Sequence, residues 1–375
     1  MMKKIKVFLD YPTTDNSTFM GLSYPQVLYD YLKTDSNFIL VKDGDPCDII
    51  MIFNGGSHYA YHLSKKEKFL LNLRTNYFYN PYLLRLLGLN RYYRPNLDYE
   101  ARINKILARN PHAKIIHRLD DRYLVLCKVY GYDETISKLN QKASITILQS
   151  QYCKTIWETD VKTIFGLQKG LTLKNPVIIG NPVDRKIFNE RGEKFEFKGK
   201  IKILHVAATG MPRKGLGTVL EFATLLKNNP EIHFILVGRQ ELDPLFGYRI
   251  KTLSNVTQIP LVIDRYELAK IYRGADLLIF PSINDCSPNT VIEALSCGLP
   301  ILCADSGGIP EIIKKPDLLS GLFIDTANPI FNLKILIENL SKFKENAIEN
   351  IKRYHDINVI GPKIKEIIIT VYNSN

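Results

Sequence analysis

The sequence predicts an α/β protein with two domains, each built on a parallel sheet. Two observations support two domains: the chain has 375 residues, more than one hydrophobic core usually organises, and a charged connection without apolar periodicity occupies residues 189–200. A third observation gives the fold class, because short apolar runs ending in loop residues are followed by helical segments. We therefore expect an N-terminal domain over residues 1–188 and a C-terminal domain over residues 201–349.

Composition indicates an ordinary globular protein with excess positive charge. Hydrophobic residues make up 45% of the chain and charged residues 23%, and no low-complexity tract is present. The formal net charge of +12 favours an anionic partner, such as a nucleotide-sugar, a phospholipid head group, a phosphorylated acceptor or a nucleic acid. Charge alone does not choose among these partners.

The cysteines and the apolar runs favour a reducing compartment. The six cysteines are scattered, most of them in apolar runs, without a C-x-x-C pair or Cys/His ligand spacing, so we expect reduced buried thiols rather than disulfides or zinc. The first apolar run stops at Asp10, too early for a signal peptide, and no run approaches the ~18–20 residues that span a bilayer. We expect a soluble, cytoplasmic protein.

The first part of the chain predicts three strands and one helix. The strands are expected at residues 5–9, 38–41 and 48–53, and an amphipathic helix at about residues 22–33. Gly21, just before this helix, is a position where backbone could closely approach a ligand. Asp43-Gly44-Asp45 has the D-x-D form of a metal-binding pair, but its place between two strands favours a turn.

Residues 65–109 combine basic side chains with tyrosines. Ten lysines and arginines occur there with three acidic residues and six tyrosines. The pattern is compatible with an interfacial patch for anionic lipid or with a cradle for a phosphorylated acceptor. A solvated helical face whose tyrosines pack on the core is the favoured interpretation. Nucleic-acid binding uses similar residues, yet the spacing of no recognised module is present.

Polar side chains follow the short apolar run Ile115-Ile116. This strand delivers His117, Arg118 and Asp120 at its carboxyl end, the edge at which parallel sheets bind ligands. The same pattern also suits a structural histidine, so both interpretations of His117 stay open. Asp121 and Arg122 are interpreted as first-turn charges of the next helix.

The second domain begins with a strand at residues 201–207. Further strands are expected at residues 233–237 and 256–260, the first followed by a ligand-facing turn with Gly238 and Arg239. The loop over residues 209–216 carries Arg213 and Lys214 and leads into a helix that extends to about Lys227. A helical region over about residues 331–368 follows near the end of the chain.

Residues 276–311 contain two strand–loop–helix units in tandem. The strand at residues 277–280 leads to a loop with Asp285, and Ser287 is expected to cap a helix over residues 288–297 that has Pro288 at its first position. Gly298 supplies a left-handed stop, and the strand at residues 300–304 leads to Gly307-Gly308. Both loops then lie at the carboxyl ends of parallel strands, where such sheets bind ligands.

The spacing of the acids in this stretch suits a nucleotide-sugar. Asp285 lies in the loop and Glu293 about one turn into the helix, and the backbone N–H groups of Asn289 and Thr290 point out of the helix start between them. The positive end of a helix favours phosphate. A diphosphate on this helix end would have a carboxylate on either side to receive the hydroxyls of a sugar and of a ribose.

The stretch resembles the donor-site signature of retaining GT-B glycosyltransferases of the GT4 type. That signature is an acid-x7-acid motif, then A-x-x-x-G-x-P, then G-G-x-x-E, matched here by Asp285, Glu293, the run from Ala294 to Pro300, and the run from Gly307 to Glu311. The family usually has Glu where this chain has Asp285. It also has an Arg–Lys pair on the donor diphosphate, of which Lys214 is present whereas the Arg position falls at Ala208.

The resemblance implies a GT-B fold, in which two Rossmann-like domains face each other across a cleft, acceptor side first and donor side second. It implies that Lys214, with Arg213 as a substitute cation, and the amides of Asn289 and Thr290 bind the diphosphate, that Glu293 binds the ribose and that Asp285 binds the donor sugar. The remaining expected site residues are His117 and Asp120 near the sugar and acceptor, the backbone of Ile259 against the base, and Ser287, Gly238, Arg239 and Gly21 around the donor. A C-terminal helix at about residues 350–375 is expected to cross back to the first domain.

By the same resemblance, the reaction is transfer of a sugar from a nucleotide-diphosphate donor to the hydroxyl of a glycan, glycolipid or related acceptor, with retention at the anomeric carbon. Protein cations and a helix end would replace a metal ion, and no cofactor is implied because the nucleotide-sugar is a substrate. Three alternatives remain open: a GT-B sugar-nucleotide epimerase or phosphorylase, a non-catalytic nucleotide-sugar-binding protein, and a basic nucleic-acid binder. Peripheral contact of residues 65–109 with an anionic membrane also remains open.

Overall fold

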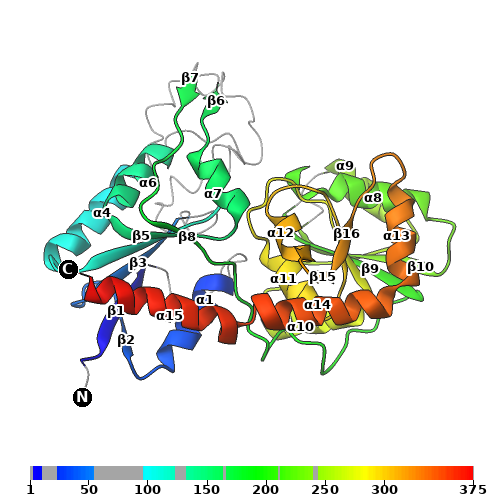
Figure 1. The fold of residues 1–375 in the computed structure, drawn as a ribbon. Helices are drawn as coiled ribbons and strands as arrows, with labels where there is room; N and C mark the ends of the chain where they lie inside the picture. The colour runs from blue at the N-terminus through cyan, green and yellow to red at the C-terminus, as the bar shows by residue number, and fades with distance from the viewer. Residues whose placement is uncertain are drawn as a thin grey trace.

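The computed structural model describes residues 3–10, 23–54, 96–122, 132–163, 166–209, 212–239 and 244–374. Within these ranges the chain forms two lobes, each centred on a six-stranded parallel sheet (Figure 1). This arrangement confirms the predicted α/β class. Gly21 and the greater part of the basic segment, residues 65–95, lie outside the described residues, and the remainder of that segment forms helix α4 (Asn96–Arg109).

The first sheet has the strand order β2-β1-β3-β4-β5-β8, and every pairing is parallel. Its strands are β1 (Ile5–Asp10), β2 (Phe38–Val41), β3 (Ile49–Asn54), β4 (Lys114–Leu119), β5 (Ala143–Leu148) and β8 (Pro176–Ile178). Strand β3 has no exposed residue between Ile49 and Phe53, as expected for a strand that helices cover on both faces.

Helices cover both faces of the first sheet. One face packs against α1 (Ser23–Lys33) and α15 (Ile357–Asn373), through a core that includes Leu28 and Ile364. The other face packs against α4, α6 (Tyr132–Gln141) and α7 (Gln151–Glu158), around the buried Trp157. A small antiparallel hairpin follows α7, formed by β6 (Val161–Thr163) and β7 (Gly166–Gln168).

The second sheet has the order β11-β10-β9-β12-β13-β16, again parallel throughout. Its strands are β9 (Ile201–Thr209), β10 (Ile232–Arg239), β11 (Val256–Ile259), β12 (Leu277–Phe280), β13 (Ile301–Cys303) and β16 (Gly321–Phe323). The order reverses between β9 and β12. In open α/β sheets this reversal separates the two following loops and leaves a crevice for ligands at the carboxyl edge.

Two helical layers enclose the second sheet. One layer contains α8 (Leu216–Leu225), α9 (Pro244–Thr252) and α13 (Pro329–Glu338). The other contains α10 (Arg265–Gly274), α11 (Asn289–Ser296), α12 (Ile309–Ile313) and α14 (Leu340–Tyr354). A two-stranded hairpin, β14 (Lys314–Lys315) with β15 (Leu318–Leu319), follows α12.

The C-terminal part of the chain returns to the first lobe. The helical region expected over residues 331–368 is divided into α13, α14 and α15, with one break at Asn339 and a second between Tyr354 and Ile357. At this turn Val183 and Asp356 form a parallel bridge, and α15 then lies beside α1 on the first sheet (Figure 1). Residues 189–200 connect β8 with β9, and the domain boundaries drawn there stay a prediction.

The structure bears on the Asp43–Asp45 turn, the cysteines and the length of the helices. Asp43-Gly44-Asp45 is a turn, closed by the Asp45 N–H donating to the carbonyl of Lys42 at 3.1 Å. The cysteines in the described part of the chain, at positions 47, 153, 286, 297 and 303, are buried and unpaired. Among the described helices, none is long and apolar enough to cross a bilayer.

The return of α15 gives a test of how the first domain is held together. Ile364→Ala removes a fully buried side chain from the shared core of α1, α15 and the sheet, and should lower the free energy of unfolding by about 2–5 kcal/mol. Glu366→Ala, at an exposed position of the same helix, should change it by less than about 0.5 kcal/mol. Urea unfolding of both variants measures the difference, and equal effects would contradict the packing of α15 on this domain.

Candidate functional site

The loop after β9 is held against the end of β12 by a glycine. Gly215 precedes helix α8 with a φ of 76°, and a Cβ atom there would lie 2.5 Å from the carbonyl oxygen of Pro281. A residue with a side chain would be strained by the positive φ and would also displace the strand end. Gly215 therefore lets the preceding short 3-10 turn (Pro212–Lys214) lie directly against the loop that follows β12.

Lys214 and Asp285 form an ion pair at this crevice. Lys214 Nζ donates to Asp285 Oδ2 at 2.6 Å, and Arg213 Nη1 lies 3.8 Å from the same oxygen. Asp285 is only 6% exposed, so water screens these charges weakly. The Nε of Arg213 is buried and has no hydrogen-bond partner among the described residues, so this guanidinium keeps a donor for a further anion.

The two glycines of the next loop enclose the peptide of Asp285. The Gly308 N–H donates to the Asp285 carbonyl at 2.8 Å. Gly307 has a φ of 70°, and a Cβ atom there would lie 2.3 Å from that same carbonyl oxygen. The Gly-Gly pair thus lets the loop after β13 approach the loop after β12 closely enough to fix the backbone of Asp285.

The start of helix α11 differs from the expectation in one respect. The predicted cap by Ser287 is wrong: Pro288 is the N-cap, the helix begins at Asn289, and no side chain caps it. The Ser287 hydroxyl is buried without a partner among the described residues. The physical reason is that the carbonyl of Pro288 accepts the first hydrogen bond of the helix, from Val291 N–H at 3.1 Å. Pro288 therefore occupies the cap position, and its side chain has no hydrogen-bond acceptor. The first N–H groups of α11 therefore have no side-chain cap among the described residues, and such groups suit an anionic ligand.

Glu293 lies on the same face of α11 as Asn289 and Thr290. Its carboxylate accepts a hydrogen bond of 3.3 Å from the hydroxyl of Tyr272. Burial raises the pKa of Glu293 to about 7, although the charge of Arg265 and the Tyr272 hydrogen bond both act to lower it. The guanidinium of Arg265 lies 5.4 Å over the ring of Phe188, and two of its nitrogens have no partner in the described part of the chain. The site therefore holds unsatisfied donors beside this carboxyl group.

On the first domain, the buried Arg118 and the partly buried Asp120 form an ion pair at the end of β4. The guanidinium of Arg118, which is 2% exposed, donates to Asp120 and lies 3.7 Å over the ring of Tyr24. Gln149 Nε2 donates to Asp120 Oδ1 at 2.7 Å. Burial raises the pKa of Asp120 to about 6 and the charge of Asp121 reinforces the rise, whereas Arg118 opposes it.

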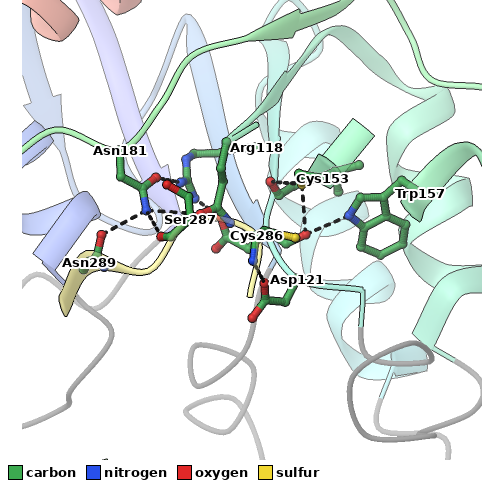
Figure 2. Close-up of polar contacts among 11 residues, drawn as sticks. Arg118, Asp121, Cys153, Trp157, Asn181, Cys286, Ser287 and Asn289 are labelled. Carbon is green, nitrogen blue, oxygen red and sulfur yellow. Dashed lines mark hydrogen bonds and ion pairs between the residues drawn. The ribbon is translucent and has the colours of Figure 1, made fainter. Parts of the chain in front are cut away.

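Asn181 connects this pair with the helix tip of the second domain (Figure 2). Its side-chain oxygen accepts from Arg118, and its amide nitrogen donates to the Ser287 carbonyl and to Asn289 Oδ1, each at 2.9 Å. The side chain thus lies between the two domains and holds the loop that precedes α11. The sequence analysis assigned no role to Asn181.

Asp121 is a further residue of the cleft that the sequence analysis missed. It was interpreted as a helical first-turn charge, but its Oδ1 accepts the N–H of Cys286 from the other domain at 3.0 Å (Figure 2). Burial raises the pKa of Asp121, and the nearby charge of Asp285 raises it further. The charges of Arg213 and Lys214 act to lower it. The adjacent Arg122 is fully buried and pairs with Asp133 at 2.6 Å. The available signal in the sequence was the adjoining pair of acids after β4.

The other expected site residues do not all meet at the Lys214–Asp285 pair. His117 is fully buried in the first sheet, where its Nδ1 lies 3.2 Å from Asn140 Nδ2, and burial lowers its pKa to about 3. Gly238, with a φ of 131°, and Arg239 end β10, although the side chain of Arg239 lies outside the described residues. Ile259 ends β11 and packs against the core of α10 and α11. Their roles stay predictions.

Metal ligands are not gathered in the part of the chain that the structure describes. No group of three or more His, Cys, Asp or Glu side chains there could hold a metal ion. The charged groups that meet in the cleft include two cations, Arg213 and Lys214, and two acids, Asp121 and Asp285.

The family of the second domain follows from a sequence comparison. Residues 187–354, which contain Lys214, Asp285 and Glu293, match the family model described as glycosyl transferases group 1. Residues 187–354, less than half of the chain, are thus similar to group 1 glycosyltransferases. This match confirms the resemblance drawn from the donor-site signature.

Curated relatives of this glycosyltransferase domain match over parts of their length. The D-inositol 3-phosphate glycosyltransferase of Segniliparus rotundus is 32% identical over 126 residues, which cover 32% of this chain and 27% of that protein. The N,N'-diacetylbacillosaminyl-diphospho-undecaprenol alpha-1,3-N-acetylgalactosaminyltransferase of Campylobacter jejuni is 27% identical over 173 residues, covering 44% of this chain and 43% of that protein. The chain thus matches less than half the length of each relative.

Solved structures match the whole fold. Sucrose-phosphate synthase from Thermosynechococcus elongatus aligns with a TM-score of 0.69 at 14% identity, covering 100% of both chains. The Anabaena protein HepE, solved with UDP and glucose, aligns with a TM-score of 0.62 at 16% identity, covering 98% of this chain and 100% of that one. The chain therefore has the GT-B fold that was predicted.

Gly215 provides a test of the crevice geometry. Gly215→Ala should lower the free energy of unfolding by about 1–3 kcal/mol, because the new Cβ meets Pro281 and the φ is positive. Gly217→Ala is the matched control: it lies inside α8 with only ordinary contact to Phe246, so it should stabilise by about 0.5–1 kcal/mol. Thermal unfolding compares the two, and a neutral Gly215→Ala would disprove the close approach.

Glu293 predicts a pH dependence of stability. Its folded pKa of about 7 lies above the ordinary value of 4.5, so the folded protein binds more protons than the unfolded chain between these values. The contribution of this carboxyl group to stability therefore falls as pH rises through this window. Glu293→Gln removes the penalty and should be more stable than wild type by about 1–3 kcal/mol at pH 8, with little difference at pH 4.5. A stability difference that is independent of pH, measured by urea unfolding, would contradict the raised pKa.

Proposed function

We propose that this protein transfers a sugar from a nucleotide-diphosphate donor to an acceptor hydroxyl, with retention of anomeric configuration and without a metal ion. The observation that supports it most strongly is the meeting of Lys214, Arg213 and Asp285 at the strand-order reversal of the second sheet, beside the uncapped tip of α11. A diphosphate needs cations and backbone donors, and a sugar beside it needs a hydrogen-bond acceptor. The match of residues 187–354 to the group 1 glycosyltransferase model supports the same expectation.

In this proposal the donor domain stabilises the leaving group. Lys214, Arg213 and the first amides of α11 receive the negative charge that grows on the diphosphate as the glycosidic bond breaks. The ion pair with Asp285 holds Lys214 in place before the donor binds, so less reorganisation is required during the reaction. Asp285 then binds a hydroxyl of the donor sugar, and Glu293 binds the ribose.

The acceptor domain orients the nucleophile. Asp120, whose pKa is raised to about 6 by burial, has one oxygen engaged by Gln149 and Arg118 at the end of β4. A carboxylate in this position is suited to accept a hydrogen bond from an acceptor hydroxyl. The departing phosphate takes the proton, so the reaction requires no side-chain base. His117 lies in the sheet behind this edge, where it would act by holding β4 and α6 together through Asn140.

Two further parts of the proposal concern what the protein contacts. A sugar or glycolipid acceptor is supported by the names of the relatives, which act on inositol phosphate or on a diphospho-undecaprenol-linked sugar. The net charge of +12 supports peripheral contact with an anionic membrane.

A non-catalytic nucleotide-sugar-binding protein is the second candidate. It is favoured by Ala208, which stands where the resemblance places a diphosphate-binding arginine. Such a protein would bind the donor without consuming it.

The experiment begins with a screen of thermal stability against UDP, GDP, ADP and their sugars, because a ligand that binds only the folded state raises the unfolding temperature. The donor found is then incubated with candidate acceptors, and the anomeric configuration of the product is read by NMR in buffer containing EDTA. Asp285→Asn should reduce transfer by on the order of 100-fold and change nucleotide affinity by less than about threefold.

Asp276→Asn is the matched control for that variant. Asp276 also pairs with two lysines, Lys202 at 3.2 Å and Lys344 at 3.6 Å, but it lies at the opposite end of β12. It should retain wild-type transfer. Donor binding without turnover would favour the second candidate, and equal turnover of Asp285→Asn and wild type would disprove the role of Asp285.

A further inference from the structure

The first turn of helix α7, in the acceptor domain, contacts the donor domain directly. The hydroxyl of its N-cap, Ser150, donates to the carbonyl of Cys286 at 2.7 Å. The hydroxyl of Tyr152 donates to Asn284 Oδ1 at 3.1 Å. Both partners flank Asp285 in sequence, so this turn of α7 lies against the loop that carries the donor-site acid.

Glu311 of the donor domain caps the same turn. One oxygen of its carboxylate accepts the N–H of Gln151 at 2.7 Å, and the other accepts the N–H of Tyr152 at 2.7 Å. These N–H groups form the positive end of α7, and hydrogen bonds from backbone to a carboxylate are among the stronger ones in proteins. The acid comes from the first turn of α12 in the other domain, about 160 residues further along the chain.

Close approach at Gly308 makes this contact sterically feasible. A Cβ atom on Gly308 would lie 1.9 Å from the carbonyl oxygen of Cys286 and 2.8 Å from Ser150 Oγ. Two residues of the acceptor domain bind the backbone of Cys286. Ser150 donates to its carbonyl at 2.7 Å, and Asp121 accepts from its N–H at 3.0 Å. Figure 2 shows Asp121 reaching this peptide from the first domain. Because Cys286 directly follows Asp285, these contacts fix the position of Asp285 relative to Asp120 and Asp121.

We propose that Glu311 is a positioning residue that closes the acceptor domain over the donor. By capping α7 it holds the acid-bearing end of β4 against the loop of Asp285, so that the acceptor hydroxyl and the donor sugar meet in a fixed geometry from which water is excluded. The sequence motif contained Glu311 but gave it no role. This inference rests on the proposed glycosyl transfer, and part of its test does not depend on that transfer.

Two variants break the contact from opposite sides. Glu311→Gln keeps the shape of the side chain and removes its charge. Gln151→Pro removes one of the two donors at the first helical position, where proline is tolerated. The preceding Ser150 has φ −159° and ψ 166°, the extended conformation that a residue before proline favours, and the side chain of Gln151 is exposed. Glu349→Gln is the control, since Glu349 pairs with Arg353 at 2.6 Å within α14.

With the nucleotide-sugar found by the screen, kcat for transfer should fall by on the order of 100-fold in Glu311→Gln and in Gln151→Pro, because a small misplacement of reacting groups costs that much. Hydrolysis of the donor should rise relative to transfer, because water enters the opened site. Affinity for the free nucleotide should change by less than roughly twofold, since Glu311 belongs to the domain contact. In the double variant, kcat should fall little further than in either single variant, because both substitutions remove the same interaction between Glu311 and α7.

Small-angle scattering provides the part that does not depend on catalysis. Wild type and Glu349→Gln should have the same radius of gyration, and both cleft variants should have a larger one. If wild type consumes no nucleotide-sugar, the proposed function fails, and scattering still decides the domain contact. The inference is overturned if folded Glu311→Gln and Gln151→Pro match the control in scattering, or if they match it in the ratio of transfer to hydrolysis.

Discussion

The ion pair between Lys214 and Asp285 is the interaction on which the rest of the site depends. It joins the loops that follow β9 and β12, the two strands between which the order of the second sheet reverses. Gly215 allows these two loops to approach within contact distance, and Gly307 does the same for the loops after β12 and β13, since a Cβ atom at either position would clash with backbone. Lys214 supplies a positive group and Asp285 a negative group at the same cleft. This arrangement suits a ligand that carries a diphosphate and a sugar.

The acceptor domain completes this arrangement rather than merely facing it. Asn181 binds the loop before α11, and Asp121 and Ser150 bind the backbone of Cys286. From the donor domain, Glu311 accepts hydrogen bonds from the first turn of α7. All of these bonds involve at least one backbone group, so they constrain the path of the loop and not only its side chains. The helix α15, which packs on the first sheet after leaving α14, keeps the two domains joined by a second crossing of the chain.

Local sequence patterns predicted the elements and the donor loops well. Apolar runs located the strands of both sheets except β5, β8 and β16, and the motif with Asp285, Glu293 and the Gly-Gly pair predicted a ligand-binding edge. The cap by Ser287 was predicted wrongly because Ser-Pro fits a cap followed by a first helical residue as well as it fits the observed start at Asn289. The surroundings of His117 could not be predicted from its position at a strand end. The face of the sheet on which a side chain lies, and what covers that face, depend on tertiary packing. In the structure it is bound by Asn140 from α6.

The sequence by itself determined the α/β class, most of the strands of the two sheets, and the presence of Lys214, Asp285 and Glu293 on loops or helix starts at one sheet edge. Only the tertiary structure decided that Asp121, Asn181 and Glu311 belong to the same cleft. Their partners lie between 106 and 165 residues away along the chain, and no periodicity or short motif encodes contacts over such separations. These contacts arise because two separately folded sheets are brought together, and the surface that each presents to the other depends on the packing of the whole chain.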